Sequence, residues 1–239
     1  MQARGVQNNL SNPFFSIILP SYNRTHLLPR AIDSVIRQSF VEWELIVVDD
    51  GSTDDTRDVV LSYVIKDDRI KYFSHTHSGL ARTRNLGLKY ANGMYITFID
   101  SDDEYRTEHL SVRHYFLAMH PDVDLLHGGV TIIGNEYVAD KFNPEKKIHL
   151  SDCAIGGTFF IRSGLVEKIG GFPLVDYGDD AVFFERAKET NAVIAKIEEP
   201  TYVYHREGTD SMCAIVEREG MEALKIFQGG GKAVTKKNN

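Results

Sequence analysis

Short apolar segments alternate with amphipathic stretches through the first half of the chain. Buried strands are predicted where β-branched and aromatic residues cluster and end in polar residues, at Phe15–Leu19, Glu44–Val48, Ile70–Ser74 and Met94–Ile99. Between them, apolar residues recur at helical spacing, which predicts helices at about Thr25–Gln38, Ser52–Lys66 and Ala81–Tyr90. Strands separated by helices are typical of a parallel sheet, which binds ligands beyond the carboxyl ends of its strands.

The second half follows a less regular pattern. A β-hairpin is predicted where Leu125–Ile133 and Glu136–Val138 flank the turn pair Gly134-Asn135. Further strands are expected at Thr158–Ile161, Val193–Ile197 and Tyr202–His205. Helices are expected at about Thr107–His120, Ser163–Ile169, Asp180–Thr190 and Met212–Phe227. The pattern therefore predicts a mixed region after the parallel one.

No repeat and no linker divides the chain into independent domains. We expect a flexible N-terminus at residues 1–12, a single α/β domain at 13–211, and a C-terminal helix with a basic tail at 212–239. A mostly parallel sheet flanked by helices is the fold class that this alternation favours. The polar clusters follow the predicted strands, so the chemistry is expected at that edge of the sheet.

Composition narrows the class of protein. The 239 residues are 42% apolar and 26% charged, which is usual for a globular chain, and the net charge of −7 argues against a basic nucleic-acid-binding surface. No apolar run approaches the roughly 20 residues of a membrane helix, and no signal-peptide pattern precedes the domain. Cys153 and Cys213 form no disulfide framework. We therefore expect a cytoplasmic protein; peripheral contact with the inner face of the cytoplasmic membrane stays open.

Asp100, Asp102 and Asp103 place three carboxylates within four residues, directly after an apolar strand. Such close carboxylates repel one another unless a cation neutralises them. Oxygen ligands suit Mg²⁺ or Mn²⁺, which also bridge substrate phosphates. The alternative is a capped loop before a helix, where acids are also favourable.

Other polar residues follow the first two strands and open the third predicted helix. Asp49 and Asp50 could accept hydrogen bonds from a ribose or a base, or could cap a helix. Tyr22 could stack on a base, or could be a partly exposed core residue. Arg84 could meet phosphate or base oxygens, or could be a solvated helix arginine.

Taken together, these segments resemble a known family. SIILPSYNR, ELIVVDDGSTDDT, GLARTRNLGL and YITFIDSDD, followed by GTFFIRSGLVEKIGGF and GDDAVFFERAKE, are similar in order and spacing to the inverting family 2 glycosyltransferases of the GT-A fold. The resemblance covers about Phe14 to Ser211. It implies a Rossmann-like sheet with a nucleotide-sugar-binding half at 13–104 and a smaller, mixed acceptor-binding half at 105–211.

The resemblance also assigns roles by position. It implies that the nucleotide sugar is bound by Pro20, Tyr22, Asn23, Arg24, Asp49, Asp50, Arg84 and Asp102. It implies a divalent cation, Mn²⁺ or Mg²⁺, held by Asp100, Asp102 and Asp103, with His205 as a further candidate. Asp180 is the implied catalytic base, supported on the acceptor side by Asp179, Gly157, Thr158 and Arg206. The helix that begins at these acids favours an ionised carboxylate.

The implied activity is metal-dependent, inverting transfer of one sugar from a nucleotide diphosphate sugar, expected to be a UDP-sugar, to a hydroxyl of a glycan, lipid-linked or other acceptor. Polysaccharide or glycan biosynthesis is the implied context. The Q-x-x-R-W motif of processive synthases is absent, because the only tryptophan is Trp43. The chain departs from the family pattern at Asp179-Asp180, usually Glu-Asp, and at His77-Ser78-Gly79, usually Asn-x-Gly.

Two other classes of protein remain as alternatives. A sugar-nucleotide pyrophosphorylase has a similar sheet, but it carries a glycine- and arginine-rich loop after the first strand, where this chain has PSYNR. A catalytically inactive nucleotide-sugar-binding module would lack acids at the metal or base positions, and here they are present. The donor sugar and the acceptor are not identified by the sequence.

Overall fold

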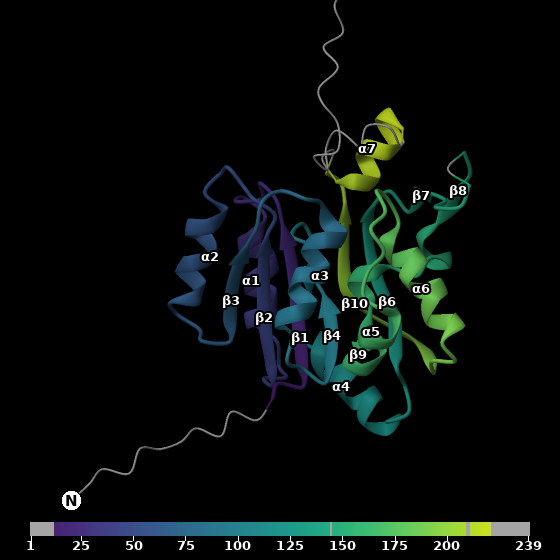
Figure 1. Cartoon of the computed structure of the whole chain (residues 1–239), viewed down its shortest axis with the longest axis horizontal. Helices are drawn as coiled ribbons and strands as arrows, with labels where there is room; N and C mark the ends of the chain where they lie inside the picture. The colour runs from purple at the N-terminus through teal and green to yellow at the C-terminus, as the bar shows by residue number, and fades with distance from the viewer. Residues whose placement is uncertain (1–11, 144, 209–210, 221–239) are drawn as a thin grey trace, which may run out of the picture.

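The computed structural model describes residues 12–143, 145–208 and 211–220 (Figure 1). Its centre is an eight-stranded sheet in the order β3-β2-β1-β4-β9-β6-β10-β5. These strands are β1 (Phe15–Ser21), β2 (Trp43–Asp49), β3 (Ile70–Ser74), β4 (Tyr95–Phe98), β5 (Glu104–Tyr105), β6 (Leu125–Gly134), β9 (Phe160–Arg162) and β10 (Ile194–Arg206). Within this sheet β9 and β5 run antiparallel to their neighbours and the other pairs are parallel. The mostly parallel sheet that the sequence predicts is therefore confirmed.

Helices cover both faces of the sheet, because successive side chains of a buried strand point to opposite sides. Ile17 and Leu19 of β1 belong to one core with α1, α2 and α4, while Ile18 belongs to a second core with α3, α5 and α6. The helices are α1 (Leu28–Ile36), α2 (Thr56–Val64), α3 (Leu80–Tyr90), α4 (His109–Met119), α5 (Ser163–Ile169), α6 (Asp179–Glu189) and α7 (Met212–Glu219).

The carboxyl ends of β1, β2, β4, β6 and β10 lie at one edge of the sheet, because these strands are parallel. A ribbon of β7 (Tyr137–Ala139) and β8 (Lys147–His149) and the helix α7 lie beyond this edge (Figure 1). The loop after β2 packs tightly there. Gly51 has φ +75, and a Cβ on it would lie 2.7 Å from the backbone nitrogen of His77.

Several predicted elements differ from the structure. The hairpin around Gly134-Asn135 is wrong: β7 pairs with β8, whereas β6 pairs with β9 and β10. The two predicted strands at 193–197 and 202–205 form one strand, β10, with an irregularity between Ile197 and Tyr202. The short strands β5 and β8 give no periodic signal in the sequence. Short strands that depend on distant partners are hard to predict, since local pattern carries little of their stability.

The terminal predictions are only partly within the described residues. The C-terminal helix is present as α7, from Met212 to Glu219. The rest of the predicted helix, the basic tail and almost all of the flexible N-terminus lie outside the described residues. Among the helices that the structure describes, none combines the length and apolarity that membrane crossing needs.

Candidate active site

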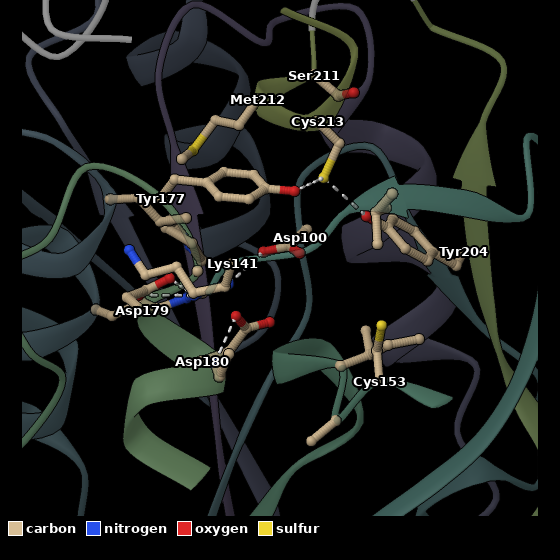
Figure 2. Close-up of a pocket in the computed structure, with 18 of the residues that line it drawn as sticks. Asp100, Lys141, Cys153, Tyr177, Asp179, Asp180, Tyr204, Ser211, Met212 and Cys213 are labelled. Atoms are coloured by element: carbon tan, nitrogen blue, oxygen red, sulfur yellow. Dashed lines mark hydrogen bonds and ion pairs between the residues drawn. The ribbon is translucent and has the colours of Figure 1, made fainter. Parts of the chain in front are cut away.

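A cavity of about 560 Å³ opens at the carboxyl edge of the sheet, between the first strands and the β7–β8 ribbon. One end is lined by loops that follow β1, β2 and β4. The other end is lined by the ribbon, the start of α6 and the start of α7 (Figure 2). The sequence-predicted residues among its lining are Pro20, Tyr22, Arg24, Asp50, Arg84, Asp100, Asp102, Asp179 and Asp180.

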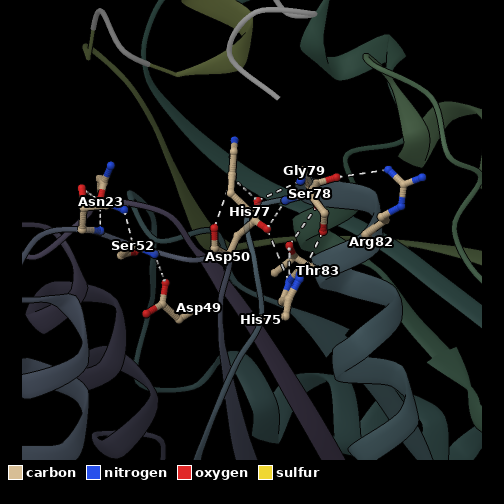
Figure 3. Close-up of polar contacts among 11 residues, drawn as sticks. Asn23, Asp49, Asp50, Ser52, His75, His77, Ser78, Gly79, Arg82 and Thr83 are labelled. Atoms are coloured by element: carbon tan, nitrogen blue, oxygen red, sulfur yellow. Dashed lines mark hydrogen bonds and ion pairs between the residues drawn. The ribbon is translucent and has the colours of Figure 1, made fainter. Parts of the chain in front are cut away.

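Asp50 organises the loop that precedes α3 (Figure 3). Its carboxylate accepts hydrogen bonds from the backbone nitrogens of Ser78 (2.7 Å) and Gly79 (2.9 Å). Nδ1 of His77 lies 2.8 Å from the same carboxylate. Because the loop starts α3, Asp50 fixes the beginning of the helix that carries Arg84.

Tyr22 stacks on His77, with ring centroids 4.0 Å apart and planes 15° apart. This pair forms an aromatic wall of the cavity, where a base could pack.

Asn23 and Asp49 are predicted to bind the nucleotide sugar, but neither residue lines the cavity. The Asn23 side chain accepts a hydrogen bond from the Thr53 backbone, and Asp49 accepts hydrogen bonds from the Ser52 backbone and from the Tyr72 hydroxyl. Asn23 and Asp49 therefore stabilise the loop that follows β2.

The acidic cluster divides between the cavity and the protein interior. Asp100 and Asp102 line the cavity. Asp103 is 0% exposed, and its carboxylate accepts hydrogen bonds from the Tyr202 hydroxyl (2.6 Å) and the His205 backbone (2.8 Å). Burial and the neighbouring carboxylates raise its pKa well above the usual value. The structure therefore gives Asp103 the position of an anchor for β10 and not of a cavity-facing ligand.

Arg84 and Asp179 form a buried ion pair beside this cluster. Nη1 of Arg84 donates to both carboxylate oxygens of Asp179 at 2.9 Å, and Nη2 donates to Asp100 at 3.2 Å. The Arg84 side chain is 4% exposed. The base or diphosphate contact predicted for Arg84 thus competes with two carboxylates that already occupy its guanidinium.

Asp180 faces the cavity from the first turn of α6. Its carboxylate accepts hydrogen bonds from the backbone nitrogens of Gly156 (3.0 Å) and Ala181 (2.8 Å). Burial and the charge of Asp179 raise the pKa of Asp180, while Arg84 and the two backbone donors oppose the rise. The helix terminus alone would lower this pKa, so desolvation and a like charge outweigh it. A raised pKa makes the carboxylate a stronger base.

Besides Asn23, Asp49 and Asp103, four further predicted residues lie outside the cavity's lining. His205 places Nε2 3.1 Å from Glu104, and Arg206 donates to Glu217 of α7 at 2.7 Å. Thr158 is 1% exposed and donates to the backbone oxygen of Ile155, and a Cβ on Gly157 would lie 2.3 Å from the Tyr202 hydroxyl. In this structure they support the walls of the cavity.

Comparison with known proteins decides the family. The family model described as Glycosyl transferase family 2 matches residues 16–163, which contain the first three strands and the acidic cluster. The chain belongs to glycosyl transferase family 2. WfgD of Escherichia coli, a UDP-Glc:α-D-GlcNAc-diphosphoundecaprenol β-1,3-glucosyltransferase, is 34% identical over 181 residues, 74% of this chain and 70% of that protein. A GalNAc(5)-diNAcBac-PP-undecaprenol β-1,3-glucosyltransferase of Campylobacter jejuni is 45% identical over 41% of this chain and 33% of its own.

Solved structures share the fold of this family 2 glycosyltransferase. S. aureus TarS 1-349 in complex with UDP-GlcNAc has a TM-score of 0.68 and 27% identity, covering 81% of this chain and 59% of TarS 1-349. Mannosyltransferase PcManGT from Pyrobaculum calidifontis, in complex with GDP-Man and Mn²⁺, has a TM-score of 0.66 over 90% of this chain and 61% of its own, at 21% identity. The chain thus spans less than two thirds of each of these structures.

The end of the cavity near α6 and α7 in this glycosyltransferase has lining residues that the sequence did not predict. It is lined by Lys141 in the loop between β7 and β8, Tyr177 before α6, Tyr204 on β10 and Cys213 on α7. In Figure 2 the hydroxyls of the two tyrosines point to the Cys213 thiol, at 3.9 and 3.8 Å. These residues come from separate segments with no shared motif. One sequence signal did fall on a lining residue: His77 stands where the family pattern usually has Asn.

The carboxylate oxygens that face the cavity are suitable ligands for a hard divalent cation. In the part of the chain that the structure describes, no group of three or more His, Cys, Asp or Glu side chains is placed to hold a metal. Asp100 and Asp102 nevertheless face the cavity together. Mg²⁺ commonly binds through one or two carboxylates, with substrate phosphates and waters as its other ligands. Two cavity-facing carboxylates are therefore enough for a cation that arrives with a diphosphate.

Proposed function

We propose that this glycosyltransferase moves one sugar from a UDP-sugar to a hydroxyl of a glycan acceptor, with a divalent cation and with inversion at the anomeric carbon. A lipid-linked acceptor in polysaccharide biosynthesis is the class favoured by the two relatives, whose names give undecaprenol-linked acceptors. The observation that carries the proposal is a cavity that has the Tyr22–His77 wall and Asp102 at one end and the Asp180 carboxylate at the other.

The two ends of the cavity have separate tasks. Tyr22 supplies a ring face for the base, and Asp100 and Asp102 hold the cation, which when bound offsets charge on the departing diphosphate. Asp180 takes the proton of the acceptor hydroxyl as that oxygen attacks the anomeric carbon. Attack from the face opposite the diphosphate inverts the configuration. The hydrogen bonds from Gly156 and Ala181 fix the orientation of the Asp180 carboxylate.

A donor panel tests the proposal. The protein is incubated with UDP-, GDP- and dTDP-sugars and Mn²⁺, binding is read by thermal shift, and released nucleoside diphosphate is assayed. Ligands that bind the folded state raise the melting temperature by mass action. We expect stabilisation and slow UDP release with a UDP-sugar. Pyrophosphate-dependent release of a sugar phosphate would indicate a pyrophosphorylase, and tight binding with no turnover in the presence of acceptor would indicate an inactive module.

Base stacking at Tyr22 gives a further prediction. Tyr22→Ala should weaken UDP binding by about 1–3 kcal/mol, the range for lost stacking on a base. Tyr22→Phe should leave the affinity almost unchanged, because the ring face and not the hydroxyl makes the contact. Isothermal titration with UDP and Mn²⁺ measures both. Equal losses in the two variants would show that the hydroxyl matters and would contradict the stacking role.

A further inference from the structure

One buried arginine joins the donor half of the domain to the acceptor half. Arg84 belongs to α3, Asp100 follows β4, and Asp179 begins α6. The ion pair with Asp179 and the bond to Asp100 therefore connect segments that lie far apart in the sequence. Because Nη1 donates to both oxygens of Asp179 and Nη2 donates to Asp100, the guanidinium is held from two sides by charge-assisted hydrogen bonds.

The surroundings of the guanidinium restrict its movement. Its central carbon lies 5.7 Å from the ring centroid of Phe98 and 5.4 Å from that of Phe172. The next residue on α3, Asn85, donates to the backbone oxygen of Phe172 and accepts from its backbone nitrogen, at 2.9 and 2.8 Å. Two successive residues of α3 thus hold the segment between α5 and the start of α6.

Three carboxylates near Arg84 explain why a positively charged side chain is needed at this position. Burial acts to lower the pKa of Arg84, but the charges of Asp179, Asp100 and Asp180 outweigh it and raise the pKa. Without Arg84 these carboxylates would repel one another across a mostly buried space. A bond from Nη1 to a donor phosphate would break the pair with Asp179, which is itself only 5% exposed, and Nε of Arg84 is buried and has no hydrogen-bond partner.

We propose that Arg84 is a positioning residue, which sets the start of α6, and with it Asp180, at a fixed place relative to Asp100 and does not bind the nucleotide. It acts through Asp179 and Asp100. This role rests on the proposed function, in which Asp180 acts on the acceptor and Asp100 faces the cation. It replaces the donor contact that the family resemblance implies for Arg84.

Arg84→Met is the variant that separates the two roles. We expect its single-turnover rate to fall by about 10²-fold, the cost of a misplacement of roughly 1 Å, while its UDP dissociation constant stays close to that of the native protein. Arg84→Lys should recover part of the rate, because it keeps the charge and loses the second nitrogen, which allows the arginine to contact Asp179 and Asp100 at once. Arg82→Met is the matched control on the same helix; Arg82 is exposed and does not line the cavity, so both quantities should stay native.

A double variant keeps the test decisive if Arg84→Met folds poorly. Arg84→Met with Asp179→Asn removes the charge from both partners of the buried pair, which is less disruptive than removing one. If Arg84 acts through Asp179, the double variant should be no slower than Arg84→Met alone. A loss of UDP affinity that matches the loss of rate, in either variant, would overturn the proposal. Failure of the proposed function is distinguishable, because the native protein would then release no UDP from any donor.

Discussion

Asp180→Asn should lose about 10²–10⁴-fold in turnover, the usual cost of removing a general base. Its UDP affinity should not change, because Asp180 lies at the acceptor end of the cavity. Asparagine favours helix starts almost as well as aspartate, so the fold should be kept. A single-turnover measurement at saturating donor isolates the chemical step. Glu189→Gln, at an exposed acid at the end of α6 that does not line the cavity, is the control and should keep native turnover.

The pH dependence of turnover gives an independent check of the same carboxylate. The base must be ionised, so the rate should fall as pH decreases through its pKa. Burial and Asp179 raise the pKa of Asp180. The fall in rate should therefore occur at a higher pH than for an ordinary carboxyl group, whose pKa is about 4. The acidic limb should disappear in Asp180→Asn. A variant with near-native turnover and an unchanged pH profile would show that Asp180 only begins a helix.

Removal of divalent cations should lower turnover by about 10²-fold or more, since a bound cation contributes several kcal/mol of charge stabilisation and each 1.4 kcal/mol is tenfold. Donor affinity should fall as well, because Asp100 and Asp102 would then face a diphosphate without a counter-charge. Calorimetry with UDP, in Mn²⁺ and in chelator, measures the difference. Equal affinity in the two conditions would contradict the metal role.

Variants of the acidic cluster assign that role to residues. Asp102→Asn should weaken Mn²⁺-dependent UDP binding, while Ser101→Ala should not. Asp103→Asn should act mainly on thermal stability, because its carboxylate bonds to Tyr202 and the His205 backbone inside the protein. If Asp103→Asn instead weakened Mn²⁺-dependent binding as strongly as Asp102→Asn, Asp103 would be a metal ligand, as the family resemblance implies.

The sequence predicts the first four strands well because its information there is local. The strands before Tyr22, Asp50 and Asp100 are mostly apolar, and each ends in polar residues that parallel order brings to one edge. The second half of the chain depends on long-range pairing. Nothing near Tyr137 indicates that its strand pairs with β8 and not with β6.

The sequence also does not predict which charged side chains form ion pairs with one another. Arg84 and Asp179 are 95 positions apart, and their pairing depends on how α3 and α6 pack. The same holds for Arg206, which bonds to Glu217 because α7 packs against β7. A motif identifies which residues carry charge, but only the packed structure shows which charges are already neutralised by another side chain.

The bond that breaks in the donor tests the central claim most directly. In ¹⁸O-water without acceptor, slow transfer to water by the native protein should release UDP that contains no ¹⁸O. This pattern shows cleavage between the anomeric carbon and oxygen, as sugar transfer requires. Label in the nucleotide phosphate, or release of a sugar 1-phosphate, would show attack at phosphorus and would contradict a glycosyltransferase mechanism for this site.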